Sequence, residues 1–384
     1  MKNLTFLFAP LIFIISFLFK KDKKIWLYGA WYGKVYSDNS RSLFEQANEI
    51  YPEIQHIWIY KDKNVLHEIP NSFNAIYAYS IKGFYLQLKS KVFICTLNSS
   101  DFIPFCITPR NILIQLWHGS PLKTIGIDSR LTFIRKIVDY IRFHTIDSYS
   151  MCISASDFFD NAFKSAFLLN QKQIFRANSP RNKSLFISQK RKNDIKHKLN
   201  IKRKEKVILY LPTHRKEGKD KSVLLQLLEL RKFHELFKDS NTKFIIKPHF
   251  YDFKNFEQFK NKEYIYILND NSINLNEMLT ISDAIVTDYS SVFFDYELLN
   301  KPIIIFPFDL KAYIQNDRKM YFDPNFVFEN LRNAIIVNKI ELLVEKCCEL
   351  KQKPSSDNFQ PSMFNQIEVD CSDIILDKIY NISQ

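Results

Sequence analysis

The sequence predicts an α/β protein built from two parallel sheets. Three observations support this: the length of the chain, the repeated order of apolar strands and helices, and a basic stretch near the middle. With 384 residues the chain is too long for one ordinary core and fits two domains. Hydrophobic residues make up 46% of it and only 14 residues are proline, so a globular protein is expected rather than a disordered one.

The first half of the chain alternates between strand and helix patterns. Strands are expected at 24–29, 55–60, 91–96, 111–116 and 151–154, with helices at 38–50 and near 81–88. This order is typical of a parallel sheet covered by helices.

The same alternation starts again after residue 206. Strands are expected at 207–211, 243–247, 264–267, 284–287 and 302–306, with helices near 222–236, 274–280 and 291–299. Ligands of open α/β sheets bind outside the carboxyl ends of the strands. The polar side chains that follow these strands are therefore the candidate site residues.

Four segments follow from these patterns. We expect a membrane anchor with a basic flank at 1–24, a first domain at 25–185, a basic connection at 186–206 and a second domain at 207–384. The connection is rich in lysine and arginine, for which a solvated charged face is the simpler interpretation and a dedicated binding patch the alternative.

The N-terminus carries an uncharged apolar run, 4–19, followed by four lysines within residues 20–24. As a helix this run is about 24 Å long, less than the roughly 30 Å of a bilayer's hydrocarbon layer. No small-residue cleavage pattern follows it, and the lysines lie on its C-terminal side. We expect an uncleaved anchor at the cytoplasmic membrane, with the catalytic body facing the cytoplasm.

Charge and cysteine usage limit the partners and cofactors. The formal net charge of +13 predicts attraction to an anionic partner, but no recognised nucleic-acid motif accompanies it. The six cysteines are scattered without CxxC pairs, so neither a zinc site nor a disulfide framework is indicated. No metal, no cofactor and no nucleic-acid partner is expected.

His118 is the most informative candidate. It follows an apolar strand, Gly119 permits a tight turn, and Ser120-Pro121 is typical of a helix N-cap followed by a first-turn proline. The imidazole would then lie in a loop at the mouth of the sheet. The alternative is a structural histidine held beneath a turn.

Four segments of the second half indicate phosphate binding. Thr213 and Arg215 follow one strand, His249 follows Lys247-Pro after the next, and a strand ending at Thr287 leads through Asp288, Ser290 and Ser291 into a helix. Arg318 lies in a later polar loop. Guanidinium groups, hydroxyls and free helix-start amides all bind phosphate. For each segment alone, a structural role is the competing interpretation.

Taken in order, these motifs resemble the CDP-glycerol glycerophosphotransferase family of teichoic-acid and capsule enzymes. The resemblance covers roughly residues 26–328 and includes Asp38-Asn39-Ser40 near the first helix. The motifs are Trp117-His-Gly-Ser-Pro-Leu-Lys123, Ser179-Pro-Arg-Asn182, Leu211-Pro-Thr-His-Arg215, Lys247-Pro-His249, Thr287-Asp-Tyr-Ser-Ser291 and Arg318 to Tyr321. The resemblance implies a GT-B fold, in which two Rossmann-like domains face a cleft, with the acceptor on the first domain and the CDP donor on the second.

The resemblance also implies roles for single residues. His118 would be the general base that takes the acceptor's proton, and His249 would act at the pyrophosphate. Thr213, Arg215, Ser290, Ser291 and Arg318 would neutralise the donor phosphates, and Asp288 would orient a loop or touch the ribose. Acceptor-side or supporting roles fall to Gly119, Ser120, Lys123 and Arg181.

Four positions depart from the family's usual pattern. Ser120 stands where threonine is usual, and Lys247 where arginine is usual, which loses the bidentate fork but keeps the charge. Lys183 and Lys319 replace a common aspartate and glycine. These changes loosen the identity of the polyol.

The expected function is membrane-associated transfer of glycerol phosphate, or a related polyol phosphate, from a CDP-linked donor to a lipid-linked or glycan acceptor. CMP is released, in teichoic-acid or capsular polysaccharide synthesis. Two alternatives stay open: a GT-B glycosyltransferase that uses a nucleotide sugar, and a non-catalytic homologue that binds an anionic polymer.

Overall fold

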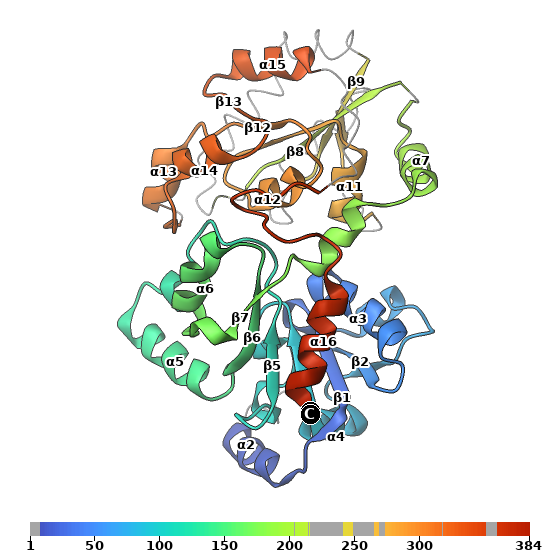
Figure 1. The fold of residues 1–384 in the computed structure, drawn as a ribbon, viewed down its shortest axis with the longest axis vertical. Helices are drawn as coiled ribbons and strands as arrows, with labels where there is room; N and C mark the ends of the chain where they lie inside the picture. Colours follow the sequence, from blue (N-terminus) through green and yellow to red (C-terminus); the bar gives the residue numbers. More distant parts are fainter. Residues whose placement is uncertain are drawn as a thin grey trace. The chain divides into compact units, whose positions relative to one another are not determined.

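The computed structural model describes residues 8–202, 204–213, 215, 241–248, 265–268, 273–316, 318–350 and 359–384. The chain divides into two compact units (Figure 1). The first comprises the residues up to Ser120, Ile125–Lys183 and Asn365–Gln384, and the second comprises Pro121–Thr124 and Ser184–Phe364. Each unit contains one parallel sheet, so the predicted α/β class with two parallel sheets is confirmed.

The first unit holds a seven-stranded sheet in the order β3-β2-β1-β4-β5-β6-β7. All of its neighbouring strands are parallel. Its strands are β1 (Asp22–Gly29), β2 (Gln55–Tyr60), β3 (Ala75–Tyr77), β4 (Ser90–Cys95), β5 (Ile112–Gln115), β6 (Tyr149–Ser154) and β7 (Ile174–Arg176). Its helices are α2 (Ala9–Leu18), α3 (Asp38–Ile50), α4 (Ile81–Lys89), α5 (Phe133–His144), α6 (Asp160–Phe167) and α16 (Ser372–Ser383).

Short 3-10 turns join these elements. They are η1 (Trp31–Gly33), η2 (Lys63–Glu68), η3 (Ser99–Asp101), η4 (Pro104–Cys106), η5 (Gly126–Ser129), η6 (Asp157–Phe159), η7 (Gln171–Gln173) and η8 (Pro180–Leu185).

The second unit holds a six-stranded parallel sheet in the order β10-β9-β8-β11-β12-β13. Its strands are β8 (Lys206–Leu211), β9 (Thr242–Ile246), β10 (Ile265–Ile267), β11 (Ala284–Thr287), β12 (Ile303–Ile305) and β13 (Ala334–Ile336). Its described helices are α7 (Gln189–Lys198), α11 (Leu275–Ile281), α12 (Val292–Glu297), α13 (Leu310–Asn316), α14 (Pro324–Asn330) and α15 (Ile340–Glu349). The helix expected near 222–236 lies outside the described residues.

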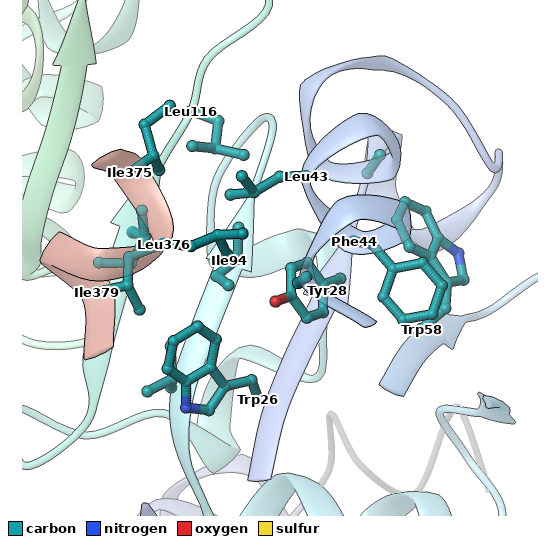
Figure 2. Close-up of a cluster of buried hydrophobic side chains, with 14 of the residues drawn as sticks. Trp26, Tyr28, Leu43, Phe44, Trp58, Ile94, Leu116, Ile375, Leu376 and Ile379 are labelled. Carbon is teal, nitrogen blue, oxygen red and sulfur yellow. The ribbon is translucent and has the colours of Figure 1, made fainter. Parts of the chain in front are cut away.

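The last twenty residues, Asn365–Gln384, belong to the first unit, whereas the sequence-based prediction placed them in a second domain at 207–384. Ile375, Leu376 and Ile379 of α16 are fully buried in the same apolar cluster as residues of β1, α3 and β5 (Figure 2). Burying these three side chains, at roughly 1.5–3 kcal/mol each, holds the end of the chain against the first sheet. Tyr51 adds a hydrogen bond of 2.5 Å to Asp377.

The prediction of a helix that begins at Pro121 is wrong. This segment is extended and belongs to the second unit, where it pairs with 319–321. Thr124 N donates to Lys319 O at 2.9 Å, and Tyr321 N donates to Leu122 O at 3.0 Å. Because a distant strand-like segment satisfies its backbone, the local Ser-Pro signal for a helix is overridden.

The N-terminal run forms a ten-residue helix, α2. One side of it rests on the first unit: Ile12 and Ser16 are buried, and Ser16 Oγ donates to Cys106 O at 2.8 Å. Arg110 Nη1 donates to Phe17 O at 2.6 Å, near the end of the helix. Within the described residues, no helix is long and apolar enough to cross a bilayer.

Candidate active site

His118 lies in the loop that leaves the carboxyl end of β5, as the sequence predicted. Gln115, the last residue of β5, shapes this loop: its Oε1 accepts from Trp117 N at 2.8 Å, and its Nε2 donates to Leu97 O at 2.7 Å. The His118 side chain is half-buried, and its Nδ1 atom is buried.

Two indole rings flank the His118 imidazole. The centroid of the Trp117 ring lies 4.0 Å away at an interplanar angle of 32°, and that of Trp31 lies 4.9 Å away at 40°. Trp31 comes from η1, just after β1, so the loops that follow β1 and β5 meet at the imidazole, although β4 separates these two strands in the sheet. These aromatic contacts therefore restrict the orientation of the imidazole.

The start of α3 supports the same loop. Asn39 Nδ2 donates to Trp117 O at 2.9 Å and to Leu116 O at 3.2 Å. Asp38 Oδ2 accepts from Trp31 Nε1 at 3.0 Å, and Asp38 Oδ1 accepts from Arg181 Nη1 at 2.8 Å. Arg181 therefore contacts this cluster through Asp38, and its supporting role stays a prediction.

The remaining acceptor-side candidates fall into different units. Gly119 has φ of +136°, a conformation that side-chain-bearing residues rarely adopt, which explains the glycine there. Ser120 is half-buried at the end of this stretch of the first unit. Lys123 belongs to the second unit, where its Nζ lies 5.3 Å from the centroid of the Tyr313 ring.

Arg215 lies among the strand-end loops of the second unit, with its side chain only 5% exposed. Its Nη1 bonds Asp288 Oδ2 at 2.5 Å. Its Nε and Nη2 bond the two carboxylate oxygens of Asp309 at 3.0 and 2.8 Å, a bidentate pair. The guanidinium also donates to Thr213 O.

Asp288 is equally engaged. It accepts from Arg215, from Thr213 N at 3.1 Å and from Tyr289 N at 2.6 Å. Tyr289 Oη in turn donates to Asp309 Oδ1 at 2.8 Å. These residues form one network, which we call the arginine brace (Thr213, Arg215, Asp288, Tyr289 and Asp309), and it ties together the loops after β8, β11 and β12.

Electrostatics within the brace keep its charges in place. Burial opposes the charged guanidinium, but Asp288 and Asp309 outweigh it and raise the pKa of Arg215 above its usual value. Burial, together with Asp309, raises the pKa of Tyr289 well above that of a free phenol. The positive charge of Arg215 is therefore balanced within the protein by the two carboxylates of Asp288 and Asp309.

Ser290 and Ser291 follow the brace and are half-buried. Ser290 Oγ accepts from Val292 N at 3.5 Å, and Ser291 makes no side-chain cap bond. The Oγ1 atom of Thr213 is buried and finds no partner among the described residues. Arg318 is exposed, whereas His249 lies outside the described residues.

Sequence reasoning missed three residues of these clusters: Trp31, Tyr289 and Asp309. Trp31 follows directly on the end of a predicted strand, which was a usable signal. Asp309 lies 94 residues from Arg215 and belongs to no local motif. Among the described residues, no three His, Cys, Asp or Glu side chains gather as a metal site requires.

A protein-family model described as CDP-Glycerol:Poly(glycerophosphate) glycerophosphotransferase matches residues 11–367 of the chain. The chain belongs to this family. It is therefore an enzyme of the glycerophosphotransferase type, and the prediction of a transferase of this class is confirmed.

Similar curated proteins act in teichoic acid synthesis. The chain is 27% identical over 362 residues to a teichoic acid poly(glycerol phosphate) polymerase of Bacillus spizizenii, covering 91% of this chain and 89% of that protein. It is 28% identical over 337 residues to a teichoic acid glycerol-phosphate transferase of Staphylococcus aureus, covering 84% and 83%.

Solved structures with the same fold include the wall teichoic acid polymerase TagF. The TM-score is 0.77 at 21% identity, covering all of this chain and 95% of that one. A UDP-GlcNAc 2-epimerase from Methanocaldococcus jannaschii is more distant, with a TM-score of 0.57 at 13% identity. These likenesses support the GT-B-like, two-sheet architecture.

Proposed function

We propose that this chain transfers glycerol phosphate, or a closely related polyol phosphate, from a CDP-linked donor to a hydroxyl of a lipid-linked or glycan acceptor. CMP leaves, and the product enters a teichoic-acid or capsular polymer at the cytoplasmic face of the membrane. The observation that carries the proposal is an imidazole, His118, held in a strand-end loop of a chain that belongs to the glycerophosphotransferase family.

The proposed reaction forms one bond and breaks one. The acceptor oxygen attacks the polyol-bearing phosphorus of the donor, and the bond from that phosphorus to the oxygen bridging the two phosphates breaks. The acceptor hydroxyl gives its proton to His118. Because Nδ1 of His118 is buried, Nε2 is the nitrogen that takes it. A base positioned in this way contributes about 10²–10⁴-fold.

The donor side is proposed for the loops of the second unit. Ser290, Ser291 and Thr213 offer hydroxyls, and exposed Arg318 offers a cation for the phosphates. The helix that follows Ser291 has only six residues, so the hydroxyls rather than a helix dipole carry this part. Arg215 and Asp288 would hold these loops rather than contact phosphate, since they are paired with each other.

His249 keeps the role that the family resemblance gives it, at the pyrophosphate, as a hydrogen-bond donor or as the acid that protonates the departing CMP. A TagF variant has been solved after a soak with CDPG, and curated relatives include polymerases of both glycerol phosphate and ribitol phosphate. Glycerol is therefore the first polyol to test and ribitol the second.

Helix α5 supports membrane association. It buries Asp139 and exposes most of its apolar side chains, the reverse of an ordinary surface helix, and it lies at the periphery of the first unit (Figure 1). The exposed fractions are high, from 44% at Ile137 to 77% at Phe133. The exposed set on α5 is Phe133, Ile134, Ile137, Val138, Tyr140 and Ile141, and Leu131, two residues before the helix, is 90% exposed.

Basic and apolar features occur together around α5 and α2. Arg135 and Lys136 on α5 are exposed, and α2 exposes Leu11, Ile14 and Leu18. The two helices rest on neighbouring turns, since Arg142 of α5 bonds η3 and α2 packs on η4. Apolar side chains beside cations match the interface of an anionic bilayer, so we propose that both helices lie in that interface.

Vesicle sedimentation of the full chain tests this surface. Vesicles with phosphatidylglycerol should bind the protein more tightly than neutral phosphatidylcholine vesicles, and Ile134→Glu with Ile141→Glu should lower the bound fraction several-fold. Ile81→Glu, an 84% exposed site on α4, is the matched control and should bind like the wild type. Equal binding by the α5 double variant and the wild type would refute the proposal that α5 contacts the membrane.

A donor panel tests the activity. CDP-glycerol, CDP-ribitol and common nucleotide sugars are each incubated with the full chain and a membrane lipid extract, and the released nucleotide is measured. CMP from one CDP-polyol is the expected result and names the donor. A nucleoside diphosphate from a sugar donor would instead establish glycosyl transfer.

A further inference from the structure

Four non-glycine residues near His118 have left-handed backbone conformations. They are Trp31 (φ +49°), Tyr32 (φ +63°), Asp38 (φ +68°) and Trp117 (φ +50°). Such a conformation costs of order 1–3 kcal/mol at each position, and it persists only where the surroundings enforce it. Two of the four residues, Trp31 and Trp117, pack their rings against the imidazole itself, and a third, Asp38, accepts a hydrogen bond from the Trp31 ring.

Hydrogen bonds from several elements hold this strained backbone. Asp101 Oδ1 accepts from Tyr32 N at 2.7 Å, while its Oδ2 accepts from Thr96 N at 3.0 Å and Leu97 N at 2.9 Å. The η1 turn is therefore tied to the end of β4. Lys61 N donates to Gly33 O at 2.7 Å, which ties the same turn to the end of β2.

The indole of Trp31 is fixed at its polar end as well as by its ring face. Its Nε1–H donates to Asp38, which is itself held by Arg181. The Asp38 side chain is only 8% exposed and that of Arg181 18%, so water competes little for this contact. A ring fixed at both ends cannot turn away from the imidazole without breaking the bond to Asp38.

We infer that Trp31 is a positioning residue for His118. The indole, anchored by Asp38, keeps the imidazole at the angle at which its other nitrogen, Nε2, can take the proton of the acceptor hydroxyl. Trp31 acts through His118. The strained backbone of η1 and of Trp117 is the conformational cost of placing both indole rings against the imidazole. This inference rests on the proposed function for the identity of the proton, but its geometric part stands without it.

Two variants separate the stacking face from the indole N–H. Trp31→Phe keeps an aromatic face, whereas Trp31→Leu removes it; Phe186→Leu, a 39% exposed aromatic of the second unit, is the matched control. We expect Trp31→Leu to lower kcat for CMP release about tenfold or more, since about 1 Å of misplacement costs about 10²-fold. The KM for CDP-glycerol should stay within about twofold. Trp31→Phe keeps an aromatic face but loses the bond to Asp38, so it should recover only part of the lost rate.

Chemical labelling reads the position of the ring without any turnover. Diethyl pyrocarbonate modifies exposed imidazoles, and peptide mass spectrometry gives the rate at His118 relative to exposed His67 in the same molecule. Trp31→Leu should raise that ratio several-fold because it uncovers a face of the imidazole, while Trp31→Phe and Phe186→Leu should leave it unchanged.

The outcomes separate this inference from the proposed function. An unchanged labelling ratio in a folded Trp31→Leu protein would overturn it, as would a rise in donor KM matching the fall in kcat, which would make Trp31 a donor contact. If the wild type released no CMP but Trp31→Leu still raised the labelling ratio, the positioning role would hold and the proposed function would be wrong.

Discussion

The strand-end sites of the two units are built by different means. In the first unit the side chain of interest, His118, is oriented through the faces of its ring by Trp31 and Trp117, over a strained backbone. In the second unit the charges expected to meet the donor, Arg215 and Asp288, are bound to each other and to Asp309. A polar residue at a strand end can thus be proposed either to take part in the chemistry or to hold the surrounding loops in place.

The largest effect that we predict is on the free energy of unfolding, and it concerns Arg215. Replacing it by methionine leaves Asp288 and Asp309 buried without their cation, so Arg215→Met should lower the free energy of unfolding by about 3–5 kcal/mol. Arg191→Met, at an exposed pair with Glu277, should cost no more than about 1 kcal/mol. Urea unfolding of both variants measures the difference.

If Arg215→Met unfolded like the wild type but lost donor binding, Arg215 would be a phosphate ligand rather than a brace. If both folding and binding were unchanged, neither role would hold.

The second effect contrasts His118 with a histidine that has a purely structural environment. His56 is buried; its Nδ1 accepts from Tyr28 Oη at 3.0 Å and its Nε2–H donates to Tyr51 O at 3.0 Å. Burial lowers the pKa of His56 from 6.5 to about 4. The folded state therefore resists protonation, and stability present above pH 6.5 is lost as the pH falls toward 4.

The loss amounts to about 3 kcal/mol at most, which corresponds to the difference between a pKa of 6.5 and one of about 4. Asp101 acts in the opposite direction, since burial raises its pKa to about 6 and favours the folded state at low pH. The difference in unfolding free energy between the wild type and His56→Gln, measured from pH 7 to pH 4, isolates the histidine. A pH-independent difference would mean that His56 is not protected from protonation.

The smallest of these effects concerns the hydroxyls beside the brace. Ser290→Ala with Ser291→Ala removes two donors proposed for the phosphates, so the KM for the CDP donor should rise about tenfold while stability changes little. Ser362→Ala, whose Oγ bonds Glu297 elsewhere in the second unit, is the control and should leave the donor KM unchanged. A wild-type donor KM in the double variant would show that the donor phosphates do not bind at these serines.

Much of the fold followed from local patterns, and the exceptions have physical causes. Long buried strands such as β1, β2 and β8 were predictable because their apolar runs are uninterrupted. The edge strands β3, β7 and β13 were not predicted; they have three residues each, and they are half-buried or exposed, so no buried apolar run marks them. The placement of α16 depends on which sheet its apolar face meets, and the sequence does not contain that information locally.

The site shows the same division. The loop position of His118 was predictable because a strand, a glycine and the family motif coincide there. The packing of Trp31 against it was not, because β1 and β5 are far apart in the sequence and β4 lies between them in the sheet. The arginine brace was missed for a similar reason: Arg215 and Asp288 each match a phosphate motif, and only the fold reveals that they neutralise each other.

The central claim is that His118 removes the acceptor's proton during phosphopolyol transfer. The most direct test measures CMP release from CDP-glycerol and donor Kd for the wild type, His118→Ala and the exposed control His67→Ala. The account predicts a loss of about 10²–10⁴-fold in CMP release for His118→Ala alone, with donor Kd within about threefold of the wild type. Full activity in His118→Ala would contradict it.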